Sequence, residues 1–236
     1  MKSLQSAAPI GGRVQGYLSQ YSQIPTLKEF RPWLRQESRA WARERLAQNA
    51  KGWKPDTQSL ESFKKDLVSK INLFPKVIGL FFSNPQWDEV SLEFFAELES
   101  FLNFEKIQCA FPRLNSNEKL EFAVCTLNQC VPQGSFGIQS APAEAPLCKP
   151  QIFLVPASLV DLSGQRLGRG RGHYDTYFSN FFSNALDTQK RDFWCCAVIH
   201  SDAVIKGLPD SWVQPHDVRV NSILANNFYL RSQNLC

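Results

Sequence analysis

The stretch Gln165-Arg166-Leu167-Gly168-Arg169-Gly170-Arg171-Gly172-His173-Tyr174-Asp175 decides how the rest of the chain is interpreted. It follows the apolar run Ile152–Pro156, which is typical of a buried strand. It precedes Thr176–Phe182, whose apolar residues have helical spacing. Three glycines at alternate positions therefore lie where a strand leads into a helix. Because glycine has no Cβ atom, a ligand can approach the backbone closely there.

The same stretch carries the groups that bind phosphate. Backbone N–H groups of the glycines, together with the N-terminus of the following helix, form an anion site. Arg166, Arg169 and Arg171 add positive charge and paired hydrogen-bond donors. Asp175 would repel a bound phosphate unless a Mg²⁺ ion lies between them. This pattern indicates a nucleoside triphosphate with its metal, although a Gly/Arg-rich loop can also be a solvated turn or contact RNA backbones.

The pattern Arg-Leu-Gly-x-Gly-x-Gly-x-Tyr-Asp, after the polar turn Asp161–Gly164, resembles the signature of 5-formyltetrahydrofolate cyclo-ligases (methenyltetrahydrofolate synthetases). The resemblance is specific in this block and looser from about Arg31 to Asn226. It implies a ligase of one-carbon metabolism that cyclises 5-formyltetrahydrofolate to 5,10-methenyltetrahydrofolate, with ATP and Mg²⁺, releasing ADP and phosphate. Such an enzyme acts mainly by positioning and charge neutralisation.

The resemblance also implies roles for individual residues. The expected ATP-binding residues are Arg31, Arg35, Arg166, Gly168, Arg169, Gly170, Arg171, Gly172, His173 and Asp175. The expected catalytic residues are Arg169, Arg171 and Tyr174, and the expected Mg²⁺ ligands are Asp175 and Asp217. Family members usually have lysine and tyrosine where this chain has Arg171 and His173. Lys28 is a rival to Arg31 in a shifted register.

For the folate, the resemblance implies contacts from Glu89, Phe136 and Tyr174. Arg113 either touches the folate or pairs at the surface. The chain departs from the family at Ser140, where members have glutamate, and at Ala225-Asn226, where members have Thr-Glu. These departures leave an alternative open, a diverged paralogue that binds nucleotide with a different substrate or a regulatory role.

The order of elements predicts an α/β fold. Arg31–Asn49 reads as a helix with Pro32 in its first turn, Val77–Phe82 as a central strand and Val90–Leu102 as an amphipathic helix. Strands that alternate with helices favour right-handed βαβ units and an open sheet. The resemblance implies a three-layer α/β/α sheet, mostly parallel, like that of ribose-5-phosphate isomerase and CoA-transferases. The glycine spacing lacks G-x-G-x-x-G, which argues against a dinucleotide-binding Rossmann fold.

Two regions are expected. Residues 1–27 are rich in Ser, Gln and Gly and predict a flexible or loosely packed extension, which Tyr17 and Tyr21 could pin to the body. Residues 28–236 predict a single α/β catalytic domain.

The amino-acid composition limits the classes of binding partner that are expected. A net charge of +4 is mild and fits an anionic small molecule better than a nucleic acid. No aromatic stacking platform accompanies the basic stretch, which also argues against an RNA-binding module. The 7 cysteines show no Cys-x-x-Cys spacing, so thiols in a reducing cytoplasm are expected rather than zinc or a disulfide framework. No run has the length of a membrane span, and a cytoplasmic monomer without a membrane or nucleic-acid partner is expected.

Overall fold

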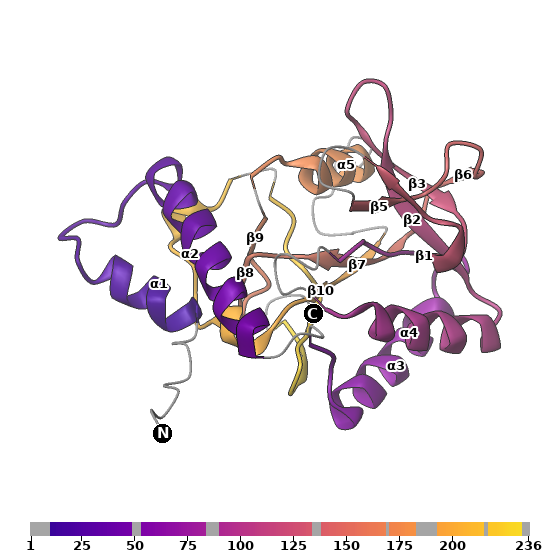
Figure 1. The fold of residues 1–236 in the computed structure, drawn as a ribbon, viewed down its shortest axis with the longest axis horizontal. Coiled ribbons are helices and arrows are strands. Elements are labelled where there is room, and N and C mark those ends of the chain that lie inside the picture. The colour runs from indigo at the N-terminus through magenta and orange to yellow at the C-terminus, as the bar shows by residue number, and fades with distance from the viewer. Residues whose placement is uncertain are drawn as a thin grey trace.

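The centre of the protein is an eight-stranded sheet (Figure 1). The computed structural model describes residues 10–48, 53–83, 90–133, 138–168, 170–182, 193–214 and 217–232. Within these residues the strand order is β13-β12-β10-β7-β1-β2-β3-β6. The strands are β1 (Val77–Gly79), β2 (Gln108–Leu114), β3 (Leu120–Val124), β6 (Leu147–Cys148), β7 (Ile152–Pro156), β10 (Trp194–Val198), β12 (Ser222–Leu224) and β13 (Tyr229–Arg231).

The five strands from β12 to β2 run parallel, and antiparallel strands close both edges. All five residues of β10 are buried, as are four of the five in β7. Continuous apolar runs of this kind are typical of central parallel strands, which are covered on both faces. The expected α/β fold with a mostly parallel central sheet is confirmed.

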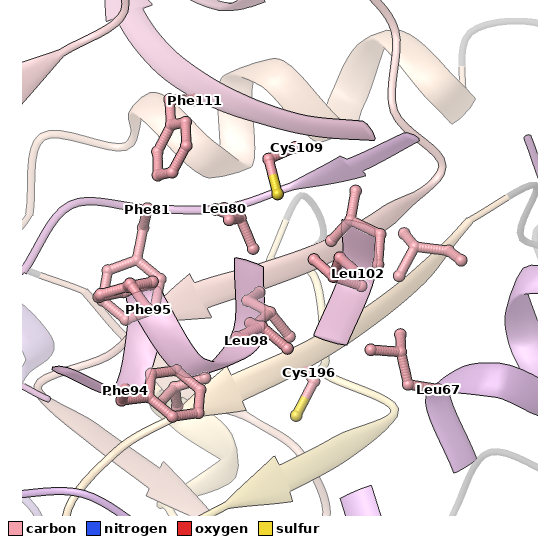
Figure 2. Close-up of a cluster of buried hydrophobic side chains, with 14 of the residues drawn as sticks. Leu67, Leu80, Phe81, Phe94, Phe95, Leu98, Leu102, Cys109, Phe111 and Cys196 are labelled. Carbon is pink, nitrogen blue, oxygen red and sulfur yellow. The ribbon is translucent and has the colours of Figure 1, made fainter. Parts of the chain in front are cut away.

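Helices cover the two faces of this sheet, as Figure 1 shows. The helices are α1 (Ile10–Leu18), α2 (Leu27–Gln48), α3 (Thr57–Ile71), α4 (Leu92–Phe104) and α5 (His173–Phe182). On one face, α3 packs against β12 and β13 and α4 packs against β2, and Figure 2 shows Phe95, Leu98 and Leu102 of α4 beside Leu80 and Phe81, which follow β1. On the other face, the ring of Phe178 in α5 stacks on Phe193 with centroids 4.9 Å apart.

Smaller elements complete the fold. A three-stranded sheet has the order β11-β8-β9, and a two-stranded sheet pairs β4 with β5. Their strands are β4 (Val131–Gln133), β5 (Ile138–Ser140), β8 (Leu159–Asp161), β9 (Arg166–Leu167) and β11 (Val204–Ile205). Three 3₁₀ turns are described, namely η2 (Leu127–Gln129), η3 (Ser201–Ala203) and η4 (Asp210–Trp212). Among the described residues, no helix combines the length and apolarity needed to cross a membrane.

The start of α2 differs from the prediction. The helix begins at Leu27, because Thr26 and Glu29 form reciprocal capping bonds. The Thr26 backbone N–H donates to Glu29 Oε2 at 2.8 Å, and the Glu29 N–H donates to Thr26 Oγ1 at 3.3 Å. Pro32 therefore lies inside the helix, and its expected place in the first turn is wrong. Arg31 and Arg35 consequently project from the interior of a helix.

The N-terminal extension also differs from the prediction over the residues described. Ile10–Leu18 form α1, in which Ile10 and Val14 are buried. Arg13 donates to Glu37 at 3.2 Å and also pairs with Glu44, both on α2. Tyr17 stacks on Trp33 with ring centroids 4.2 Å apart. Residues 10–18 are thus packed on the domain rather than flexible, with Tyr17 among the contacts that hold them.

Two other boundaries shifted by a few residues. The helix predicted from Val90 begins at Leu92, because Ser91 caps it by accepting the Phe94 N–H at 3.4 Å. Val90 instead forms an isolated bridge with Trp53. The helix predicted from Thr176 begins at His173, directly after the glycine stretch.

A buried carboxylate fastens α3 to the edge strand β13. Asp66 is 3% exposed and accepts hydrogen bonds from the Tyr229 hydroxyl and the Arg231 guanidinium. Burial opposes ionisation of this group, but the bonds from Tyr229 and Arg231 hold the pKa of Asp66 below its ordinary value. The C-terminal strand is therefore tied to the helical layer by charge-assisted bonds.

His200 makes stability depend on pH. It follows β10, lies against the rings of Trp41 and Trp53 at 5.4 and 5.7 Å, and accepts the Asp202 N–H at Nδ1. Burial, with a smaller contribution from Arg45, lowers the pKa of His200 to about 4. The unfolded chain has an ordinary histidine pKa near 6.5 and binds the proton first as pH falls.

We therefore expect the wild type to lose up to about 3 kcal/mol of stability, relative to a His200→Gln variant, between about pH 6.5 and pH 4. Urea unfolding of both proteins at half-unit pH intervals measures this difference. Parallel stability curves for the two proteins over this range would show that His200 is not held neutral by the fold.

Candidate functional site

A buried aspartate shapes the turn that precedes the glycine stretch. Asp161 is 3% exposed, and its Oδ1 accepts the Ser163 N–H, the Ser163 hydroxyl and the Gln165 N–H at 2.9, 2.7 and 3.0 Å. Its Oδ2 accepts the Leu208 N–H at 2.8 Å. Gly164 in this turn has φ +85°, and a Cβ there would lie 2.3 Å from the Val220 carbonyl oxygen. The turn is therefore fixed from both sides before the chain enters β9.

The side chain of Arg166, in β9, pairs with the aspartate in the first turn of α5. Its side chain is 3% exposed, and Nη2 donates to Asp175 Oδ1 at 2.5 Å. Its Nη1 lies 3.6 Å from where a Cβ on Gly168 would stand, and its Cζ is 5.8 Å from the centroid of the Tyr174 ring. The structure thus brings together Arg166, Tyr174 and Asp175, three residues that the sequence placed at one site. The Asp175 carboxylate is already neutralised by a guanidinium.

Two arginines from α2 lie against the same loop. Gly170 has φ +87°, and a Cβ there would be 3.1 Å from both Arg31 Nη1 and Arg35 Nη2. In the part of the chain that the structure describes, neither Arg31 nor Arg35 has a carboxylate within ion-pair distance. Because they are four residues apart on one helix, the two cations also repel each other. An anion bound at Gly170 would relieve this repulsion.

The helix N-terminus adds to the anion-binding character. The Gly172 carbonyl accepts the Thr176 N–H at 2.8 Å, so Gly172 stands at the beginning of α5. Its φ is +67°, a conformation that favours glycine. The first N–H groups of α5 therefore follow the loop without interruption.

His173 is held neutral at the start of α5. Burial, and next the nearby charge of Arg171, lower the pKa of His173 below its ordinary value. Its Nε2 is buried and has no hydrogen-bond partner among the residues described. The imidazole therefore places an unsatisfied polar atom beside the loop without adding charge.

Asp217 is connected to the loop through Gln165. Its Oδ2 accepts from Gln165 Nε2 at 3.3 Å and from the Gln214 N–H at 2.9 Å. Gln165 directly precedes Arg166, so the segment that carries Asp217 lies beside the start of the glycine stretch. That Asp217 shares a cation with Asp175 stays a prediction. No cluster of three or more His, Cys, Asp or Glu side chains suited to a metal occurs in the described ranges.

Three of the expected site residues fall outside the described residues: Glu89, Phe136 and Arg169. Their contacts with folate and phosphate stay predictions. Arg171 is described and exposed, beside Gly170 and Gly172.

Arg113 pairs within the protein, and a contact of its side chain with the folate stays a prediction. Its Nη1 donates to the carbonyl oxygens of Pro142 and Ala143 at 2.6 and 2.7 Å, and its Nε lies 3.5 Å from Glu121 Oε2. It lines a cavity of about 330 Å³ between β2, β3 and the β4–β5 sheet. Ser140 nearby is buried, and its hydroxyl lies 3.4 Å from the Pro112 carbonyl oxygen.

Sequence reasoning missed the roles of Asp161 and Gln165. Asp161 was read as part of a polar turn, yet it anchors four donors and so sets the position of Gln165. The available signal was the order Asp-x-Ser-Gly, in which an aspartate commonly bonds the backbone two residues on.

Comparisons of the sequence with known proteins find one enzyme family. The model of the 5-formyltetrahydrofolate cyclo-ligase family matches residues 96–226. A 5-formyltetrahydrofolate cyclo-ligase of Mycolicibacterium smegmatis is 35% identical over 83 residues, which are 35% of this chain. The chain spans only 37% of the length of that relative in the match.

Solved structures share the fold. The 5,10-methenyltetrahydrofolate synthetase of Aquifex aeolicus has a TM-score of 0.55 and 18% identity, covering 86% of this chain and 93% of its own. The synthetase of Mycoplasma pneumoniae has a TM-score of 0.50 and 18% identity, covering 83% of this chain and 98% of its own. At this identity the likeness concerns the fold alone.

Two glycines of the loop allow a matched test of the site. Gly170→Ala and Gly172→Ala each keep the backbone N–H, and each places a side chain at positive φ, at a cost of about 1–2 kcal/mol. Only the methyl group at position 170 meets Arg31 and Arg35, because nothing lies within 4 Å at position 172. We expect Gly170→Ala to weaken binding of inorganic triphosphate about 5-fold, roughly 1 kcal/mol, and Gly172→Ala to change it much less.

Calorimetric titration with triphosphate, after urea unfolding has shown similar stability for both variants, makes this comparison. Equal affinities for the two variants would mean that the guanidiniums at Gly170 do not bind the anion.

Proposed function

We propose that this chain, which belongs to the 5-formyltetrahydrofolate cyclo-ligase family through the model match to residues 96–226, cyclises 5-formyltetrahydrofolate to 5,10-methenyltetrahydrofolate. The reaction would depend on ATP and Mg²⁺ and would release ADP and phosphate. The observation that carries the proposal is the approach of Arg31, Arg35 and Arg166 to the loop from Gly168 to Gly172. These groups come from two parts of the chain and surround a backbone that is open to a ligand.

The arginines of α2 and the backbone N–H groups of the loop would bind the triphosphate from opposite sides. Arg31 and Arg35 extend from α2 toward Gly170, and they bring two positive charges without acidic partners in the described part of the chain. The N–H groups of the loop and of the α5 N-terminus face the anion from the other side. Arg169 and Arg171 would add charge as the phosphoryl group moves, which is how phosphoryl transfer is generally catalysed.

Asp175 and Asp217 are the proposed ligands of the magnesium ion. Mg²⁺ commonly takes one or two carboxylates and completes its shell with water and substrate phosphates, so a larger acidic cluster is not required. Arg166 binds Oδ1 of Asp175, and among the described residues no hydrogen bond is made to the second oxygen of that carboxylate, which would take the cation. When bound, the ion would neutralise the charge of the phosphate oxygens. Arg166 then has a second function, because it holds Asp175 in one orientation beside the loop.

The folate would lie on the side of Tyr174. The Tyr174 ring is near Arg166 and packs toward Phe178, with ring centroids 6.1 Å apart, so its orientation is supported from β9 and from α5. Glu89 and Phe136 are proposed to contact the folate, by analogy with the family. Placing the formyl oxygen against the terminal phosphate is the main work asked of the protein, since held reactants need little further activation.

A second candidate function is favoured by the two departures from the family pattern. Ser140 is buried against backbone carbonyl oxygens and supplies no carboxylate. Ala225 is fully buried, and the Asn226 side chain accepts the Ser201 N–H at 2.8 Å, so this position has a structural role. A paralogue that binds nucleotide but acts on another substrate, or regulates, would show these features.

For either function we propose a cytoplasmic monomer that binds no nucleic acid and no membrane.

The formation of methenyltetrahydrofolate, followed by its absorbance, tests the proposal. We expect turnover by the wild type with 5-formyltetrahydrofolate and Mg-ATP, and about 100-fold less from Asp175→Asn, since one preorganised charged group is commonly worth that much. Asparagine keeps an oxygen that can accept from Arg166, so the fold is preserved. Asp210→Ala, at an exposed acid in η4, is the matched control and should keep full activity.

The outcomes separate the two candidates. ATP binding by the wild type without folate turnover would select the diverged paralogue. Wild-type activity in Asp175→Asn would remove Asp175 from the metal site while leaving the reaction itself in place.

A further inference from the structure

Two cysteines outside the phosphate site lie close together. Cys125 follows β3, and Cys130 directly precedes β4, with the short turn η2 between them. Their Sγ atoms are 3.6 Å apart. A disulfide bond is about 2.05 Å long, so the sulfurs must approach by about 1.5 Å to form one. Both are thiols in this structure, and Cys130 is the more exposed of the two.

The surroundings favour reaction at Cys125. The hydrogen bond with the Cys130 thiol holds the pKa of the Cys125 thiol below its ordinary value, although burial and the charge of Glu99 oppose it. The positive charge of Arg113 acts in the same direction as the hydrogen bond. A thiolate rather than a thiol is the nucleophile in oxidation.

Other cysteines nearby are held in the unreactive form. Burial raises the pKa of Cys109 to about 12 and that of Cys148 to about 11. Cys196 is fully buried, and its pKa is also raised. The hydrogen bond that lowers the pKa of Cys125 raises the pKa of Cys130. Cys125 therefore differs from these three cysteines in its ionisation, and its short distance to a second sulfur supplies the geometry for a disulfide.

We propose that Cys125 and Cys130 are a site of reversible oxidation, at which a small peroxide converts the two thiols into an intramolecular disulfide. The Cys125 thiolate attacks one peroxide oxygen, the O–O bond breaks, and the departing hydroxide is protonated to water. The Cys130 sulfur then attacks the Cys125 sulfenic acid, the S–S bond forms, and a second water leaves. Two thiols lose two electrons and two protons in total, and hydrogen peroxide becomes two waters.

The disulfide would fix the start of the β4–β5 sheet to the main sheet. The Cys125 backbone N–H donates to the Cys109 carbonyl of β2 at 3.3 Å, so Cys125 is attached to the main sheet. Cys130 leads into Val131 and Pro132, which pair with β5 and line the cavity of about 330 Å³ beside Arg113. Movement of Cys130 toward Cys125 therefore changes one wall of this cavity. This inference does not depend on the function proposed above.

Peptide mapping of the full-length protein after hydrogen peroxide treatment tests the proposal. The reduced protein is treated with a few equivalents of peroxide, remaining thiols are alkylated, and non-reduced peptides are identified by mass spectrometry. We expect the loss of two thiols per chain, one crosslinked peptide joining Cys125 to Cys130, and full recovery with dithiothreitol. Cys148→Ser should give the same crosslink, whereas Cys130→Ser should give none and stop at an oxidised Cys125.

A first crosslink between any other cysteines, a crosslink between two chains, or an unchanged thiol count in the wild type would overturn the proposal. The wild-type map is decisive by itself, so it remains valid even where a serine variant folds poorly.

Discussion

Three guanidinium groups face one glycine turn, and the architecture around the site holds them there against their mutual repulsion. Arg31 and Arg35 come from α2, and Arg166 comes from β9, more than a hundred residues later in the chain. Asp175 is engaged with Arg166, so in the described part of the chain the positive charge at Gly170 has no acidic counterpart. Like charges held close together cost free energy that the fold must supply. A bound anion would relieve this repulsion, and the free energy gained would add to the affinity for the anion.

Rigid supports on both sides keep the charges in place. The α2 helix is capped by Thr26 and Glu29, and α1 packs along it through Arg13 and Tyr17. On the other side, Asp161 fixes the turn before β9 with four hydrogen bonds. The loop between these supports is glycine-rich, so its backbone is open to conformations that other residues rarely adopt. Precise placement of this kind is what positioning catalysis requires.

The fold followed from the sequence where apolar patterns were strong. The sequence predicted the central strand β7 and the helix α4 to within two residues, because each buries a continuous or regularly spaced apolar face. The start of α2 differs from the prediction because Thr26, one of its two capping residues, lies within the expected N-terminal extension. The helix α1 was missed because its glycines have low helix propensity. A Cβ on one of them, Gly11, would lie 3.1 Å from both the Asp202 carbonyl oxygen and Ile205 Cγ2, so a close tertiary approach that no local pattern predicts favours glycine there.

The residues of the candidate site could be predicted from the sequence, but the side-chain pairings between them could not. The glycine spacing and its arginines indicated a phosphate site from local chemistry, whereas Arg31 and Arg35 entered only through the family resemblance. The pairing of Arg166 with Asp175 depends on side-chain directions at a strand end and a helix start, which sequence spacing does not fix. The neighbouring thiols Cys125 and Cys130 were likewise seen only as scattered cysteines, because their approach depends on the turn η2.

The most direct test of the charge arrangement is the affinity for Mg-ATP, measured by calorimetry on single arginine variants of α2. Arg31→Ala and Arg35→Ala should each weaken binding about 10-fold, equivalent to about 1.4 kcal/mol, without loss of folding stability. Arg43→Ala, at an exposed position two turns along the same helix, should bind as the wild type does. If all three variants bind Mg-ATP equally well, the nucleotide does not lie at the glycine turn and the account is contradicted.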